Sequence, residues 1–205
     1  NNDSFEKEQD EIFYTNYLDG TALIKGEPLN TFFSYRFKGL SPEDGRPMFY
    51  NVEQEHEQEY LKMDREEVFR RVMKVSGTRV PVLQGGVSNT FSYKRMSLSF
   101  NFSYSFGSKI RLMQLYGSNS NGTTVAPLPE RNVRREFVKR WQRPGDEEHT
   151  NIPGLLSNAA YSATLRPWWK TGNNNSINFA DNIWQMYDNS DIRTVSGNYL
   201  KLQSF

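Results

Sequence analysis

The stretch MSLSFNFSYSF, Met96 to Phe106, alternates between large apolar or aromatic residues and the small polar residues Ser and Asn. An alternation with a period of two is typical of a β-strand with one buried face and one wet face. Its 11 residues also lie within the roughly 9 to 11 that a tilted transmembrane β-strand needs. The stretch therefore predicts a long strand and leaves open whether its apolar face meets a protein core or lipid.

The residues before this strand repeat the alternation and predict an antiparallel hairpin. We expect Lys94 and Arg95 to form a two-residue turn. One face then pairs Tyr93 with Met96, Phe91 with Leu98, Asn89 with Phe100 and Val87 with Phe102. The other face pairs Ser92 with Ser97, Thr90 with Ser99, Ser88 with Asn101 and Gly86 with Ser103. The hairpin thus has an apolar face and a small polar face without a single charge.

The uncharged polar face separates two classes of β-protein that share this alternation. A sandwich strand that faces bulk water usually carries Lys, Glu or Arg, whereas the lumen of a plugged barrel suits Ser, Asn and Gly. A short turn on one side, and no further clean alternation until YLKLQSF at Tyr199 on the other, is also typical of outer-membrane barrels. The pattern favours a barrel and leaves a soluble sandwich open.

Composition excludes several other classes. The 205 residues, 36% hydrophobic and 24% charged, suit one domain of ordinary size. No run approaches the roughly 18 apolar residues of a membrane-spanning helix, and the first residues lack the pattern of a signal peptide. The chain has no cysteine, so we expect no disulfide and no thiolate metal site, and a net charge of +1 gives no reason to expect nucleic acid.

Local signals predict further elements outside the hairpin. We expect a strand over Thr31 to Leu40, a charged solvated loop over Asn51 to Met63, a helix from Asp64 that Gly77 ends, and a helix over Val133 to Trp141. Asp64 and Glu67 have the spacing of a capping box. Val68, Val72 and Val75 recur at helical spacing behind them.

The stretch PVLQGGVSNTFSYKRMSLSFNFSYSFGSKI, Pro81 to Ile110, resembles the hairpin of SusC/RagA-type TonB-dependent outer-membrane transporters. Three more stretches are similar to motifs of that family in the same order: Ser34 to Asn51, Arg140 to Leu155, and Met186 to Phe205. At the turn, Arg95 departs from the Gly or Asn that is usual in the family. The resemblance implies a mainly β fold, with antiparallel strands of a transmembrane β-barrel and long, partly helical extracellular loops.

Members of this family look like long chains with a plug and a barrel of about 22 strands. Neither the plug nor a TonB box is found here, so we expect an incomplete, non-closed piece of the later part of the barrel. Residues 1–205 would be a single segment of the receptor barrel domain. Its parts would be a hairpin at about 82–106, a long loop at about 107–196 and a last strand at about 197–205.

The resemblance also implies a function for the whole protein. It would import oligosaccharide or peptide nutrients across the outer membrane of a Bacteroidetes-like bacterium, with a SusD-like lipoprotein as partner and energy from TonB acting through the missing plug. We expect no catalysis, no cofactor, no metal and no nucleic acid. The alternative that stays open is a soluble β-rich surface module that binds glycan or protein.

The resemblance and the pattern together suggest roles for single residues. Expected lipid-facing residues are Phe91, Leu98, Phe100 and Phe102, and expected interfacial girdle residues are Tyr93 and Tyr104. Candidate ligand contacts are Trp168, Trp169, Trp184 and Tyr187, which could stack on sugars or pack on peptides, or could instead form a core within the loop. The basic residues Arg131, Arg134, Arg135, Lys139, Arg140 and Arg143 could bind nucleic acid or an acidic ligand, but they are interleaved with acidic residues and predict a solvated or ion-paired helix face. His56 among glutamates predicts a charged loop rather than a metal site.

Overall fold

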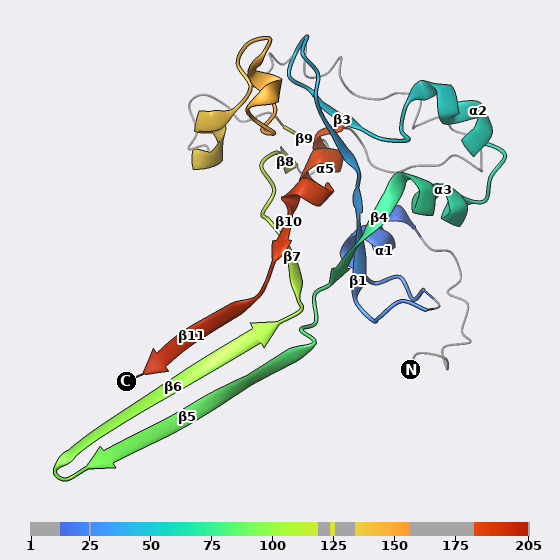
Figure 1. Cartoon of the computed structure of the whole chain (residues 1–205). Coiled ribbons are helices and arrows are strands. Elements are labelled where there is room, and N and C mark those ends of the chain that lie inside the picture. Colours follow the sequence, from blue (N-terminus) through green and yellow to red (C-terminus); the bar gives the residue numbers. More distant parts are fainter. Residues whose placement is uncertain (1–12, 25, 119–123, 126–133, 156–182, 205) are drawn as a thin grey trace.

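The computed structural model describes residues 13–24, 26–118, 124–125, 134–155 and 183–204. Within these residues the chain is mainly β, with antiparallel strands and few helices, as the sequence predicts, and the strands close no barrel. A long strand arm projects from a body that contains the helices (Figure 1). The arm and the body have different surfaces.

The arm is a three-stranded antiparallel sheet in the order β11-β6-β5. Its strands are β5 (Leu83–Tyr93), β6 (Met96–Phe106) and β11 (Tyr199–Ser204). Every predicted hairpin pair is present, and the pairing continues to Leu83 opposite Phe106. In β11, Leu200 lies opposite Tyr104 and Leu202 opposite Phe102, before a register shift between Leu202 and Ser204. The predicted hairpin register and the predicted last strand are therefore confirmed.

The arm strands continue into the body through short breaks. The strand β4 (Met73–Thr78) precedes β5, β7 (Lys109–Arg111) follows β6, and β10 (Thr194–Ser196) precedes β11 and pairs with β7. At the break the Gly197 amide donates to the Ser108 carbonyl (2.9 Å), and a Cβ on Gly197 would lie 2.5 Å from the Ser108 hydroxyl. The strands β7 and β10 lie at the two ends of the predicted long loop, and the sequence pattern did not predict them.

The predicted strand Thr31 to Leu40 is divided into β1 (Thr31–Tyr35) and β2 (Phe37–Leu40). The strand β1 pairs with β4, whereas β2 pairs with β3 (Pro47–Phe49). The change of partner occurs at Arg36, because the Tyr35 amide donates to the Asn189 carbonyl (3.1 Å) and the Tyr50 amide donates to the Arg36 carbonyl (3.0 Å). A contact with a residue far along the chain thus interrupts what the sequence presents as one strand.

The N-terminal half of the body contains α1 (Tyr14–Asp19), the 3-10 turn η1 (Gln54–His56), α2 (Glu57–Tyr60) and α3 (Arg65–Val72). The prediction of a loop over Asn51 to Met63 is wrong, since Tyr60 of α2 is buried and its hydroxyl donates to the Asn51 carbonyl (2.7 Å). The helix α3 also ends earlier than predicted, and Gly77 lies within β4. Asp64 is its N-cap residue by backbone geometry, but its side chain makes no capping hydrogen bond, so the predicted capping box is absent.

The C-terminal half contributes η2 (Arg135–Lys139), η3 (Asp146–Glu148), α5 (Ile183–Asp188), η5 (Asp191–Arg193) and the short strands β8 (Gly117–Ser118) and β9 (Thr124–Val125). The predicted helix Val133 to Trp141 is a 3-10 helix, and Val133 lies outside the described residues. The Trp141 ring packs over Gly45, where a Cβ would clash with it. Its indole nitrogen donates a hydrogen bond to the Glu147 carboxylate (3.0 Å).

Aromatic residues from both halves form one core. Tyr17 of α1 packs edge-on against Phe33 of β1 with ring centroids 5.0 Å apart, and Tyr116 packs against Trp184 of α5 at 4.8 Å. Arg111 of β7 connects α1, β1 and the residue that follows α5 through hydrogen bonds. Its guanidinium donates to the carbonyls of Leu18 (2.9 Å) and Phe33 (2.6 Å), the Asn189 side chain (3.0 Å) and the Ser34 hydroxyl (3.1 Å). Burial lowers the pKa of Arg111 to about 10, with nearby Arg79 acting in the same direction.

Candidate functional site

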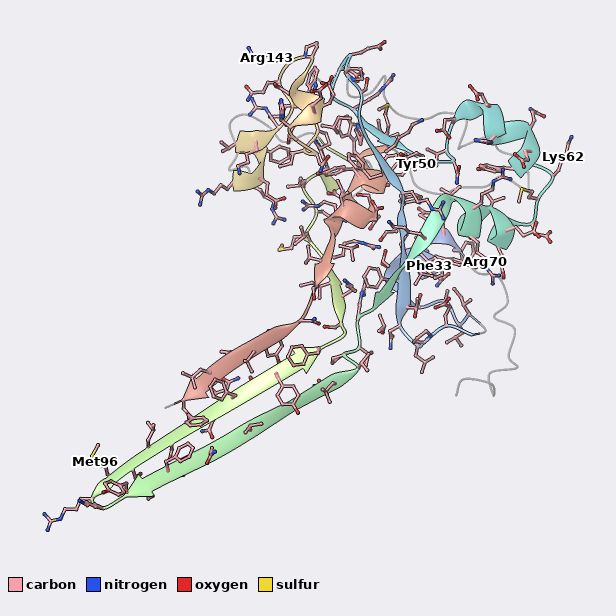
Figure 2. The ribbon with its side chains drawn as sticks, viewed as in Figure 1. Phe33, Tyr50, Lys62, Arg70, Met96 and Arg143 are labelled. Carbon is pink, nitrogen blue, oxygen red and sulfur yellow. The ribbon has the colours of Figure 1, made fainter. Side chains whose placement is uncertain are left out.

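The candidate site is the apolar face of the arm. Side chains on this face stand clear of the body in the structure (Figure 2). Their exposed fractions are 52% for Val87, 57% for Phe91, 56% for Leu98 and 66% for Leu200. Phe91 and Phe100 have ring centroids 5.8 Å apart, and Phe100 and Phe102 have centroids 5.4 Å apart. The arm therefore presents a continuous aromatic and aliphatic surface.

An exposed surface of this kind marks an interaction with protein or membrane, because burying apolar area is favourable by roughly 25 cal/mol per Å². The face carries no charged residue between Leu83 and Tyr93 or between Met96 and Phe106. The four predicted lipid-facing residues Phe91, Leu98, Phe100 and Phe102 all lie on it. Contact of these residues with lipid stays a prediction.

The two tyrosines predicted as girdle residues lie at opposite ends of this face. Tyr93 precedes the turn at the tip and is 70% exposed. Tyr104 lies near the body, across from Gly85, where a Cβ would come within 2.7 Å of the Tyr104 hydroxyl oxygen. The glycine thus makes room for the ring to lie over the neighbouring strand. A role of the two tyrosines as interfacial girdle residues stays a prediction.

The opposite face of the arm is small and polar, and its side chains bond to one another. The Thr90 and Ser99 hydroxyls lie 2.9 Å apart, and the Gln203 amide donates to the Ser103 hydroxyl (2.6 Å). Lys201 of β11 lies opposite Ser103 and adds a charge to this face. The hairpin residues alone did not show this charge, because pairing of the last strand could not be deduced from them.

Two of the four candidate ligand contacts lie in the core of the body. Trp184 is 0% exposed and Tyr187 is 1% exposed, so neither offers a surface to a ligand, and their prediction as contacts is corrected. Phe37 and Tyr116 pack edge-on against Tyr187 at centroid distances of 5.9 and 6.0 Å. Trp184 and Tyr187 instead follow the alternative interpretation, in which aromatic residues of this segment form a core. Trp168 and Trp169 lie outside the described residues.

Sequence reasoning missed a buried carboxylate beside this core. Asp188 is 2% exposed and accepts hydrogen bonds from the amides of Leu115 (2.7 Å) and Tyr116 (3.1 Å). Burial raises the pKa of Asp188 to about 6, although the two amide donors act in the opposite direction. The carboxylate joins α5 to the segment that follows β7. No local sequence signal separates this aspartate from an exposed one.

Charged residues elsewhere in the body form ion pairs. Arg134 pairs with Glu136 (3.0 Å) and Arg143 with Asp146 (3.8 Å), which fits the predicted ion-paired face, whereas Arg131 is among the residues not described. His56 lies 3.7 Å from Glu53 and 3.5 Å from Glu59. In the described ranges no group of three or more His, Asp or Glu side chains has an arrangement that could hold a metal ion.

The described helices include none that is long and apolar enough to cross a membrane.

Comparisons with known proteins give one structural similarity. No protein-family model and no curated protein matches the sequence. The chain is similar to a chain in the solved structure of the RagAB peptide importer in the closed-closed state, with 14% identity and a TM-score of 0.42. The similarity covers 88% of this chain and 17% of that chain, so this chain spans about a sixth of the importer chain. At this TM-score the similarity carries no argument about function.

Proposed function

We propose that this chain is part of the wall of an outer-membrane active transporter that imports oligosaccharide or peptide nutrients. The observation that carries the proposal is the arm, a three-stranded sheet with one exposed apolar face and one polar face, where Ser, Asn, Thr and Gly of the hairpin lie beside Lys201 of β11. A membrane wall needs these two faces, since one meets lipid and the other meets the barrel interior.

The length of the arm supports a membrane-spanning position. The strands β5 and β6 each have 11 residues, and at about 3.4 Å per residue an antiparallel strand of that length extends about 37 Å. Tilted by about 45°, it would cover about 26 Å along the membrane normal, close to the roughly 25 Å apolar band of outer-membrane barrels. In that position Tyr93, at the tip, and Tyr104, opposite Gly85 near the body, would lie near the two limits of the band.

The transport role rests on the four motifs that resemble SusC/RagA-type transporters. Two of these motifs, Ser34 to Asn51 and Arg140 to Leu155, contact each other in the body. Trp141 packs over Gly45, and the Gly154 amide donates to the Gly45 carbonyl (3.1 Å). In the whole protein a SusD-like lipoprotein would be the partner and TonB would supply energy through a plug. We propose no catalytic role for any residue, and no cofactor.

A labelling experiment on one strand tests the proposal. Single cysteines are placed at Leu98, Ser99, Phe100, Asn101, Phe102 and Ser103 of β6 in the protein in its outer membrane. Each variant is treated with a membrane-impermeant thiol reagent and with a lipid-phase probe. We expect the cysteines at 98, 100 and 102 to react with the lipid-phase probe and those at 99, 101 and 103 not to react with it. Equal reaction of both sets with the impermeant reagent would refute the proposal.

A second candidate function is a soluble β-rich surface module that binds glycan or protein. Lys201 favours it, because this charge lies on the polar face next to Ser103, as on a sheet that faces bulk water. The same cysteines separate the two functions. A soluble module would show the polar set accessible to the impermeant reagent and no reaction of either set with the lipid-phase probe.

A further inference from the structure

The charges of the hairpin are confined to its tip. Between Leu83 and Phe106 the only charged residues are Lys94 and Arg95, which are adjacent, exposed and form the turn. Neither makes an ion pair within the part of the chain that the structure describes. Two positive charges thus stand at the end of a hairpin that is otherwise uncharged, and Lys201 of the neighbouring strand β11 lies opposite Ser103, away from the turn.

The backbone conformation of Lys94 at the tip is unfavourable for lysine. Lys94 has φ of +54°, a conformation that Gly or Asn adopts readily and that is unfavourable for a side chain such as lysine. A turn that served only to reverse the chain would be more stable with Gly or Asn at this position. Strain at an exposed turn points to a role for the side chain itself.

The neighbours of the two cations are apolar and exposed. The Lys94 ammonium lies 5.2 Å from the ring centroid of Tyr93, which is 70% exposed, and Met96 on the other strand is 77% exposed. Figure 2 shows Met96 at the far end of the arm, away from the body. Aromatic rings at the boundary of acyl chains, with cations just beyond them, are the arrangement that meets a lipid headgroup layer.

We infer that the Lys94–Arg95 turn binds the phosphate groups of anionic phospholipids in the leaflet at the tip of the arm. Arg95 offers a planar fork that matches phosphate oxygens, and Lys94 offers a compact charge. Free phosphate is a poor occupant, because a small ion needs converging donors, whereas this tip has two exposed cations beside an apolar face that a membrane would cover. The inference rests on the proposed function, since the tip reaches headgroups only if the arm spans the membrane.

Vesicle binding by the full chain tests the inference. The wild-type chain, K94Q/R95Q and K62Q/R143Q are mixed with vesicles of phosphatidylcholine alone or with about 30% phosphatidylglycerol, and bound protein is measured by flotation. Both double variants remove two positive charges, but Lys62 and Arg143 lie on the body, far from Met96 at the tip (Figure 2). Since each cation at an anionic surface contributes about fivefold, we expect K94Q/R95Q to lose about 30-fold of its preference for the anionic vesicles and K62Q/R143Q to keep it.

Two outcomes would overturn the inference. An equal loss in both double variants would mean that only net charge matters, and an unchanged preference in K94Q/R95Q would mean that the tip does not contact headgroups. Replacing chloride by inorganic phosphate at equal ionic strength is expected to leave binding unchanged, and strong competition would assign the turn to free phosphate instead.

Failure of the proposed function gives a different result. If the arm does not span a membrane, cysteines at Leu98 and Phe102 do not react with the lipid-phase probe in any vesicle. If only the headgroup contact is wrong, those cysteines react equally in both kinds of vesicle and in K94Q/R95Q. The two measurements together therefore separate a wrong headgroup contact from a wrong position of the arm.

Discussion

At the scale of single residues, Asp188 makes stability depend on pH. Its pKa rises from an ordinary 3.8 to about 6 because burial disfavours the anion. The folded chain then holds this proton more tightly than the unfolded chain does. The contribution of Asp188 to the free energy of unfolding is therefore most favourable below pH about 4 and falls as the pH rises to about 6, by about 3 kcal/mol in all.

The variant Asp188→Asn isolates this effect, because an amide cannot ionise and keeps one oxygen to accept an amide hydrogen bond. We expect the unfolding free energy of the wild-type chain, minus that of D188N, to decrease as the pH rises from about 4 to about 6. Denaturant titrations of both proteins across this range measure the difference and cancel the titration of other groups. A difference that grows with pH would show that the Leu115 and Tyr116 amides favour the anion more than burial disfavours it.

At the scale of elements, the β2–β3 turn is attached to the η2–η3 segment through one glycine. A Cβ at Gly45 would enter the Trp141 ring, and Gly45 also has φ of +69°. Gly26 is a matched control with φ of +88° and open space around it. We expect G26A to lower the free energy of unfolding by about 1 kcal/mol through its backbone alone, and G45A by about 3 kcal/mol through backbone and crowding. Equal losses in thermal or denaturant unfolding would show that Trp141 moves aside freely.

Elements were predictable where the pattern is long and local. The hairpin register followed from the sequence because two alternating strands meet at a two-residue turn, and a slip by one residue would set apolar residues opposite polar ones. The strands β7 and β10 have three residues each, too few for an alternation to stand out. The break at Arg36 depends on Asn189, and the burial of Trp184 and Tyr187 depends on residues of the N-terminal half, so no local pattern contains them.

At the scale of the whole molecule, the arm and the body satisfy their apolar residues differently. The body buries its aromatic residues in a core of its own, whereas the arm leaves Phe91 and Leu98 exposed. The apolar face of the arm could be predicted from sequence because it depends on alternation within one hairpin. The burial of Trp184 and Tyr187 could not, because exposure of a loop aromatic is set by the packing of the entire body.

Charges placed on the two faces of β6 test this division in the full chain. Lysine at the midplane of a barrel's lipid face costs about 2 to 4 kcal/mol, whereas lysine on the interior face is tolerated. We expect the L98K/F102K chain to insert no longer into phosphatidylcholine vesicles and the S99K/S103K chain still to insert. Flotation and protection of the arm from protease measure this insertion. Both variants add two positive charges to the same strand, so the change in net charge is matched.

In aqueous buffer without lipid, the wild-type chain should self-associate through the apolar face of the arm. Sedimentation should show that L98K/F102K reduces this association while S99K/S103K does not. The same behaviour of the two variants in both measurements would mean that the faces are equivalent and that the arm is a two-sided sheet in water.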